Sequence, residues 1–225
     1  MQFPNRTRGA ARAKATRERS STKSVVAAID VGSTKVCCLI AEPVVSRYAA
    51  VLENARPELK ILGFGHQASR GVRAGVIVDV GEAEKAIRLA VDAAERMAGF
   101  AIGEVVAGVS GGRPQCRTYR GQTRIMGCDI AAVDAQRALA CAAQQVSPGN
   151  RIVLHATPVR FHVDDAQGVR QPLGMFGETL SADLNVVTME PGALMNLGLA
   201  IGRCHLDVRG YVIAPYAGAR SVLVD

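Results

Sequence analysis

The segment from Val25 to Ala41 limits the possible folds more than any other part of the sequence. Two apolar runs are separated there by a short stretch of small and polar residues, Gly-Ser-Thr-Lys at positions 32–35. Apolar runs on either side of turn-forming residues predict two strands joined by a tight turn. Glycine in such a turn tolerates positive φ and lets the backbone come close to a ligand. We therefore expect a fold that begins with a strand–turn–strand unit.

The polar residues around this turn are candidates for binding a phosphate and a metal ion. The backbone N–H groups of Gly32, Ser33 and Thr34 can form a concavity of the kind that holds an anion, and Lys35 adds a positive charge. Asp30 ends the first strand and can hold a hydrated Mg²⁺, because this ion takes oxygen ligands. An ordinary hairpin with polar turn residues explains the segment equally well.

The formal net charge of +7 is concentrated at the N-terminus. Residues 1–23 hold seven basic residues and one acidic residue, so the rest of the chain is close to neutral. We predict a disordered basic tail over residues 1–23 and no nucleic-acid-binding surface on the body. The composition of the tail also fits a transit peptide or a weak contact with anionic lipid. No apolar run is long enough to span a bilayer.

The six cysteines include no C-x-x-C pair, and no cluster of cysteine and histidine has the spacing of a zinc site. Free, buried thiols in a reducing compartment are therefore expected.

The rest of the chain alternates between strand and helix patterns. Predicted strands cover 59–66, 104–110, 151–163, 180–189 and 208–213, and predicted helices cover 81–98, 131–146 and 191–204. Asp79 and Glu82 predict the N-terminal cap of the first helix, and Gly99 predicts its end. The polar stretch from Gln115 to Ile125 is typical of an edge strand or hairpin arm. Pro158 indicates a bulge or an edge position.

The order of these elements predicts an insertion in a larger α/β domain. Residues 81–163 form the inserted unit, and residues 24–80 and 164–225 form the parent domain. Within the insertion, an exposed arm carrying Arg117, Arg120 and Arg124 is suited to contact another protein. A solvated edge strand whose arginines deter pairing is equally consistent. We expect charge reversal at Arg120 and Arg124 to impair association and to leave folding intact.

Four motifs, taken in their order along the chain, are similar to those of a known protein family. They are the loop Asp30-Val31-Gly32-Ser33-Thr34-Lys35, the stretch SRGVRAGVIVD at 69–79, the strand EVVAGVSG at 104–111 and the segment PLGMFG at 172–177. Together they resemble the FtsA family of bacterial cell-division proteins, in the actin-like superfamily. Ser33 stands where threonine is frequent in the family, which keeps the hydroxyl group.

The resemblance implies an incomplete actin-like (ribonuclease H-like) lobe with an inserted small α+β subdomain of the SHS2 type. The chain is similar to the N-terminal half of such a protein, from an alphaproteobacterium-like lineage. It reaches Asp225 before the family's second phosphate loop and membrane-binding helix. By resemblance, Asp30, Gly32, Ser33, Thr34 and Lys35 contact the phosphates of ATP, and Asp30 also contacts hydrated Mg²⁺. No catalytic residue is implied, and this half is expected to be inactive.

The resemblance also implies a place in the cell and a set of partners. Proteins of this family help assemble the Z ring and tether FtsZ to the cytoplasmic face of the membrane at the division site. FtsZ and other division proteins are thus the implied partners of the full-length parent, with self-association through the inserted subdomain. No nucleic-acid partner is implied, and membrane contact is expected only through the helix that this chain lacks.

Three other functions fit parts of the pattern. An adaptor of type IV pilus assembly shares the actin-like fold and the inserted subdomain, although the motifs at 69–79 and 172–177 favour the cell-division family. A small-molecule kinase of the same superfamily needs a catalytic carboxylate near the acceptor hydroxyl, and none is recognisable. A nucleic-acid-binding role rests only on the arginine-rich tail.

Overall fold

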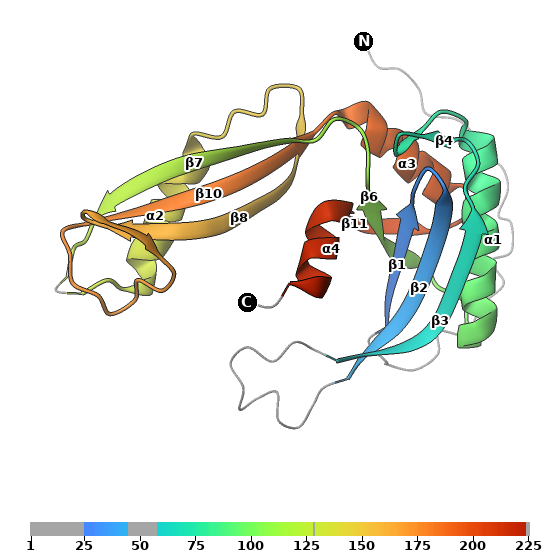
Figure 1. Ribbon diagram of the computed structural model, residues 1–225, viewed down its shortest axis with the longest axis horizontal. Coiled ribbons are helices and arrows are strands. Elements are labelled where there is room, and N and C mark those ends of the chain that lie inside the picture. The colour runs from blue at the N-terminus through green and yellow to red at the C-terminus, as the bar shows by residue number, and fades with distance from the viewer. Residues whose placement is uncertain (1–24, 45–57, 128, 224–225) are drawn as a thin grey trace, which may run out of the picture.

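The computed structural model describes residues 25–44, 58–127 and 129–223. They form two units, each with its own main sheet (Figure 1). The predicted tail at 1–23 and most of the predicted connection at 43–57 lie outside the described residues. In the described part, no helix combines the length and the apolar character that a membrane span needs.

The first unit is built on a five-stranded sheet with the order β11-β6-β1-β2-β3. Its strands are β1 (Val26–Val31), β2 (Lys35–Val44), β3 (Glu58–Ala68), β6 (Glu104–Val109) and β11 (Asp207–Ile213). The first three pair antiparallel in sequence order, whereas β1, β6 and β11 run parallel to one another. The sequence correctly predicted the strand–turn–strand start and the α/β class.

Two helices, α1 (Val80–Ala98) and α3 (Pro191–Gly202), cover one face of this sheet and complete its core. The predicted cap of α1 is confirmed, because the Asp79 carboxylate accepts a hydrogen bond from the Glu82 N–H at 3.0 Å. The helix ends at Gly99, whose φ of 82° only glycine adopts without strain.

Helix α1 lies unusually close to β3. A Cβ atom placed on Gly65 would overlap the carbonyl oxygen of Ala90, and one placed on Gly63 would overlap that of Ala94. Small residues on both elements therefore allow backbone to pack on backbone. This contact fixes the position of α1 over the sheet.

The opposite face of the five-stranded sheet is partly open in the described residues. Helix α4 (Ala214–Val222) lies on this side in Figure 1 and contacts β11 and β6. On β3, Ile61 and Phe64 are 57% and 49% exposed. The hairpin of β4 (Val72–Arg73) and β5 (Val76–Ile77) connects β3 to α1.

The second unit is a four-stranded sheet with the order β7-β10-β8-β9, covered on one face by α2 (Ala132–Gln144). Its strands are β7 (Gln115–Arg124), β8 (Ile152–Val163), β9 (Ala166–Val169) and β10 (Thr179–Met189). Strand β7 is an edge strand, as predicted. The bulge expected at Pro158 is also present, because the pairing with β10 shifts between Pro158 and Arg160.

The bounds predicted for the inserted unit, 81–163, do not match the sheets. Helix α1 and strand β6 belong to the first unit, because α1 packs on β3 and β6 pairs with β1 and β11. Strand β10 belongs to the second unit, because it is the central partner of both β7 and β8. The second sheet therefore spans residues 115–189, which corrects the prediction at both ends.

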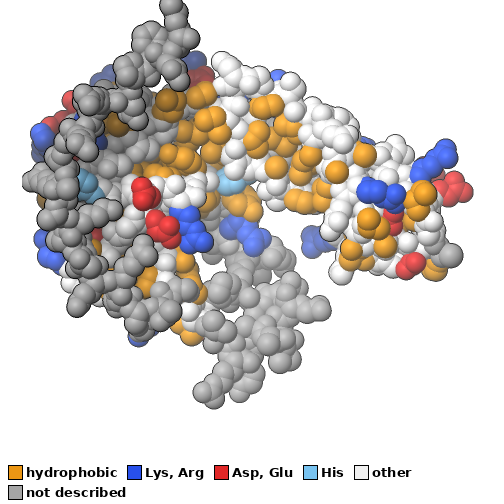
Figure 2. All heavy atoms as spheres, turned by 180° about the vertical axis from the view of Figure 1, so that it is seen from behind, with side chains coloured by type: hydrophobic (Ala, Val, Ile, Leu, Met, Phe, Trp, Pro, Cys, Tyr) orange, Lys and Arg blue, Asp and Glu red, His pale blue; other side chains and the backbone are white. Residues whose placement is uncertain are grey.

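The two units share a junction beside α4 and β11. His155 of β8 accepts a hydrogen bond from the backbone N–H of Ile213 at 3.1 Å, and its ring lies 5.3 Å from that of Tyr216. Met189, at the end of β10, is fully buried in the core of the first unit. Seen from behind, apolar side chains are visible over the connection between the units (Figure 2).

All five cysteines that the structure describes are free, as predicted. Cys38 is buried, and this burial raises the pKa of its thiol to about 12. Cys116, in contrast, is exposed and the other three are partly exposed, so among the described cysteines burial is confirmed for Cys38 alone.

Candidate functional site

Three segments that are distant in the sequence meet where β1 and β6 end. The turn between β1 and β2 is closed by a hydrogen bond from the Gly32 N–H to the Lys35 carbonyl oxygen, at 3.0 Å. The turn of the β4–β5 hairpin lies against it, and the residues after β6 lie against the hairpin turn. Ligands of open α/β sheets commonly bind at the carboxyl ends of parallel strands, which is where this cluster lies.

Glycines allow the second and third segments to touch. A Cβ atom on Gly75 would lie 2.6 Å from the backbone nitrogen of Gly111, and one on Gly111 would overlap the carbonyl oxygen of Ala74. Ala74 and Gly75 both have positive φ, 49° and 71°, as a two-residue hairpin turn requires. The motifs at 69–79 and 104–111 are thus two sides of one backbone contact.

The hairpin also holds the β1–β2 turn in place. The hydroxyl oxygen of Ser33 accepts a hydrogen bond from the Gly75 N–H at 2.8 Å. The Ser69 N–H donates to the carbonyl oxygen of Thr34 at 3.0 Å. Because Ser33 acts as an acceptor here, its own O–H proton is available to a ligand.

The structure refines the predicted anion-binding turn. The Gly32 N–H is engaged by Lys35 and cannot contribute. Within the described residues, the N–H groups of Ser33 and Thr34 have no protein partner. Ser33, Thr34 and Lys35 are exposed, so the turn offers two backbone donors and one hydroxyl to the solvent.

Asp30 is exposed beside this turn, on the face of the sheet that α1 does not cover. Its neighbour on β6 is Gly108, and a Cβ atom there would lie 2.8 Å from the Asp30 carboxylate oxygen. The missing side chain at Gly108 therefore makes room for the carboxylate. In the described part of the chain, no group of three His, Cys, Asp or Glu side chains is placed to hold a metal ion.

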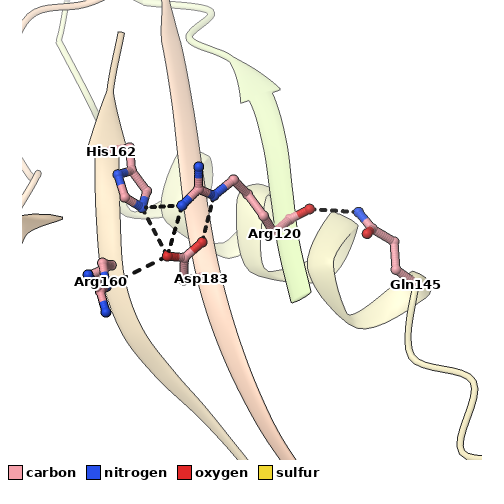
Figure 3. A network of polar contacts seen from close by, with 5 residues as sticks. All are labelled: Arg120, Gln145, Arg160, His162 and Asp183. Atoms are coloured by element: carbon pink, nitrogen blue, oxygen red, sulfur yellow. Dashed lines mark hydrogen bonds and ion pairs between the residues drawn. The ribbon is translucent and has the colours of Figure 1, made fainter. Parts of the chain in front are cut away.

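A second polar cluster lies on the face of the four-stranded sheet opposite α2 (Figure 3). The buried carboxylate of Asp183 receives two hydrogen bonds from Arg120, at 2.7 and 3.1 Å. His162 lies 3.0 Å and Arg160 3.7 Å from the same carboxylate. The hydrogen bonds from Arg120, supported by His162, hold the pKa of Asp183 at about 2.

This cluster corrects the prediction that Arg120 belongs to a free arm. Its guanidinium group is tied to Asp183, and its backbone carbonyl oxygen accepts a hydrogen bond from Gln145 at 2.7 Å (Figure 3). Arg124 is exposed. Charge reversal at Arg120 would therefore disturb the sheet itself, because a glutamate would face the buried Asp183 carboxylate.

The sequence indicated the residues of the first cluster but not their contacts. Asp30, Ser33, Thr34 and Lys35 lie together, as expected from one short segment. The roles of Gly75 and Gly108 were missed, although both lie in motifs that the sequence singled out. Two signals in the sequence could have indicated these roles. Gly75 is a glycine in a hairpin turn, and Gly108 is a glycine inside an apolar strand, where glycine often marks a close approach of another group.

Comparisons with known proteins agree with this architecture. Residues 111–188 match the family model described as the SHS2 domain inserted in FTSA. The chain is 42% identical over 206 residues to the cell division protein FtsA of Rhizobium meliloti and 30% identical over 201 residues to that of Pseudomonas aeruginosa. These alignments cover 92% and 89% of this chain, and 47% and 46% of the relatives.

A solved structure, the PilM-PilN type IV pilus biogenesis complex, has a similar fold. The TM-score is 0.54 at 13% sequence identity, over 87% of this chain and 49% of that chain. The fold is thus that of an actin-like protein with an inserted SHS2 domain. The chain belongs to the FtsA family of cell-division proteins, and it spans about half the length of the curated relatives it matches.

Proposed function

We propose that the full-length parent of this chain is an ATP-binding adaptor that helps assemble the Z ring and tethers FtsZ at the inner face of the membrane. The observation that carries the proposal is the 42% identity with an FtsA over 92% of the chain. An adaptor of pilus assembly is the second candidate, since a PilM-PilN structure has the same fold. This chain is only 13% identical to that structure, compared with 42% to the FtsA of Rhizobium meliloti, so cell division is the better-supported function.

Within this proposal, the turn after β1 contacts the phosphates of ATP. The N–H groups of Ser33 and Thr34, the Ser33 hydroxyl and the Lys35 ammonium group all suit an anion. Asp30 would hold Mg²⁺ through its water shell, and the space over Gly108 fits a carboxylate in that role. A bound Mg²⁺ neutralises charge on the phosphates. These residues bind and orient the nucleotide, and none is proposed to act in bond breaking.

Depletion of the full-length parent in its own host tests the cellular role. Cells should elongate without forming septa, and a fluorescent fusion of the parent should gather at the division site before constriction. Normal septation during depletion, or normal septation with a loss of pili, would overturn the cell-division proposal in favour of the pilus alternative.

We expect the 225-residue chain by itself to bind ATP weakly. In the actin-like fold the nucleotide is held between two lobes, and this chain provides the phosphate contacts of one of them. Isothermal titration calorimetry with Mg²⁺ present is the measurement. A dissociation constant of about 1 µM or tighter, near 8 kcal/mol of binding free energy, would contradict this expectation.

In the full-length parent, Asp30→Ala should weaken the binding of Mg²⁺–ATP about tenfold, because the hydrated ion loses a charged hydrogen-bond acceptor. Affinity for ATP in the presence of EDTA should change little, since the carboxylate acts through the metal. Asp92→Ala, which removes an exposed carboxylate on α1, is the matched control and should have no effect. Equal affinities of wild type and Asp30→Ala for Mg²⁺–ATP would remove Asp30 from the site.

A further inference from the structure

A polar hollow lies in the inserted domain, where α2 ends and no longer covers β7. It has a volume of about 240 Å³, and its lining includes Arg117, Tyr119, Arg151 and the loop at 147–149. Arg117 and Tyr119 lie on the α2 side of the sheet, because Gly121 of the same strand packs under the helix. The hollow therefore continues the α2-covered face of the sheet beyond the end of the helix.

Positive charge dominates the hollow and its rim. Arg151 is 15% exposed and is fixed by hydrogen bonds to the hydroxyl and the carbonyl oxygen of Thr188, at 3.0 and 3.2 Å. Another of its hydrogen bonds reaches the carbonyl oxygen of Arg113, at 2.5 Å. Glu190 is the nearby carboxylate, 3.9 Å from both Arg113 and Arg151. Arg117 is exposed, and within the described residues it has no ion pair.

Among the described residues, the outer backbone edge of β7 lacks hydrogen-bond partners beside the hollow, whereas farther along side chains from α2 and its C-terminus bond to it. Gln145 of the α2 C-terminus donates to the outward carbonyl oxygen of Arg120, and Arg137 of α2 donates to that of Arg124. Backbone groups that point outward alternate along an edge strand, so those of Cys116 and Thr118 point the same way. In the part of the chain that the structure describes, these two residues have no backbone partner on that side.

From these observations we propose that the β7 edge at residues 115–118 binds an acidic, extended segment of a partner protein by strand addition. The added strand pairs with the backbone of Cys116 and Thr118, and its carboxylates face Arg117 and Arg151 across the hollow. The charge of the hollow selects an acidic segment over a basic one. This inference gives the chemistry of one partner contact of the proposed adaptor, and it does not depend on the nucleotide site.

Peptides of alternating sequence test the inference on the 225-residue chain. Fluorescence anisotropy should detect binding of a labelled ten-residue peptide that alternates threonine and glutamate. A peptide that alternates threonine and lysine should not bind. Hydrogen exchange should show that the amides of Cys116 and Thr118 become protected in the complex, while that of Gln122 does not. No binding of the glutamate peptide at about 1 mM would overturn the inference.

Charge variants separate a specific site from a general electrostatic effect. Arg117→Glu should weaken binding of the glutamate peptide at least about tenfold, because it replaces attraction by repulsion in the lining of the hollow. The matched control is Arg170→Glu, an exposed position after β9 at the opposite edge of the sheet, which should change affinity less than about twofold. Equal losses in both variants, or binding without protection of the Thr118 amide, would contradict strand addition at this edge. These outcomes leave the test of the division function unaffected.

Discussion

Replacing Gly65 with alanine is expected to destabilise the first unit by about 3 kcal/mol or more. The new Cβ atom would overlap the carbonyl oxygen of Ala90 and lie 2.8 Å from its carbonyl carbon. Both atoms belong to the backbone of α1, so no side-chain rotation relieves the contact. The helix has to move away from β3, which opens the core beneath it. The loss of stability should therefore lie at the upper end of the values that overpacking causes.

Urea unfolding of the 225-residue chain, followed by circular dichroism, measures this effect. Gly202→Ala is the matched control, because a Cβ atom there meets nothing within 4 Å at the end of α3. Alanine at that position should leave stability unchanged or raise it by up to about 1 kcal/mol. If Gly65→Ala unfolds at the same urea concentration as Gly202→Ala, the close packing of α1 on β3 is wrong.

Replacing Asp183 with asparagine is expected to destabilise the inserted domain by about 2 kcal/mol at neutral pH. The amide keeps the size of the side chain but cannot balance the charges of Arg120 and Arg160. The loss is smaller than for a fully buried ion pair, because the Arg120 side chain is 57% exposed and solvent screens its charge. Asp165→Asn, in the exposed turn before β9, is the control and should change stability by less than about 0.5 kcal/mol.

The effect of Asp183 should depend on pH in a defined direction. The pKa of its carboxylate is about 2 in the folded protein, below the ordinary value of 3.8, so the ionised form stabilises the native state. The contribution of the Asp183 charge to stability, measured through the difference between wild type and Asp183→Asn, should therefore be fully present above about pH 5 and be lost progressively as the pH falls toward 2 and below. A difference that persists unchanged at pH 2 would show that the charge of Asp183 is not its cause.

The local elements of this chain follow from local sequence. The helix from Asp79 to Gly99 was predicted at both ends, because its cap and its left-handed terminal glycine are contacts within one turn. The bulge at Pro158 was predicted for the same reason, since proline cannot donate to a neighbouring strand. The polar turn at residues 30–35 was indicated because its residues are contiguous.

The assignment of elements to the two units could not be made from the sequence. The sequence of β6 is an apolar run, which predicts a strand but does not indicate which sheet the strand joins. The structure places it beside β1. It also places β10 between β7 and β8, although the paired residues of β10 and β7 lie 55 to 73 positions apart in the sequence. Pairing between distant strands depends on the packing of the whole chain, which explains the error in the bounds 81–163.

Sequence alone thus determined the class of the fold, the capped helix α1 and the polar turn after β1, because each depends on neighbours within a few residues. Only the tertiary structure decided that Gly75 holds Ser33, that Gly108 makes room for Asp30 and that Arg120 belongs to the Asp183 cluster. These contacts join residues that lie between 42 and 78 positions apart. They form because the sheets bring distant strands into register, and no local pattern encodes which residues will meet.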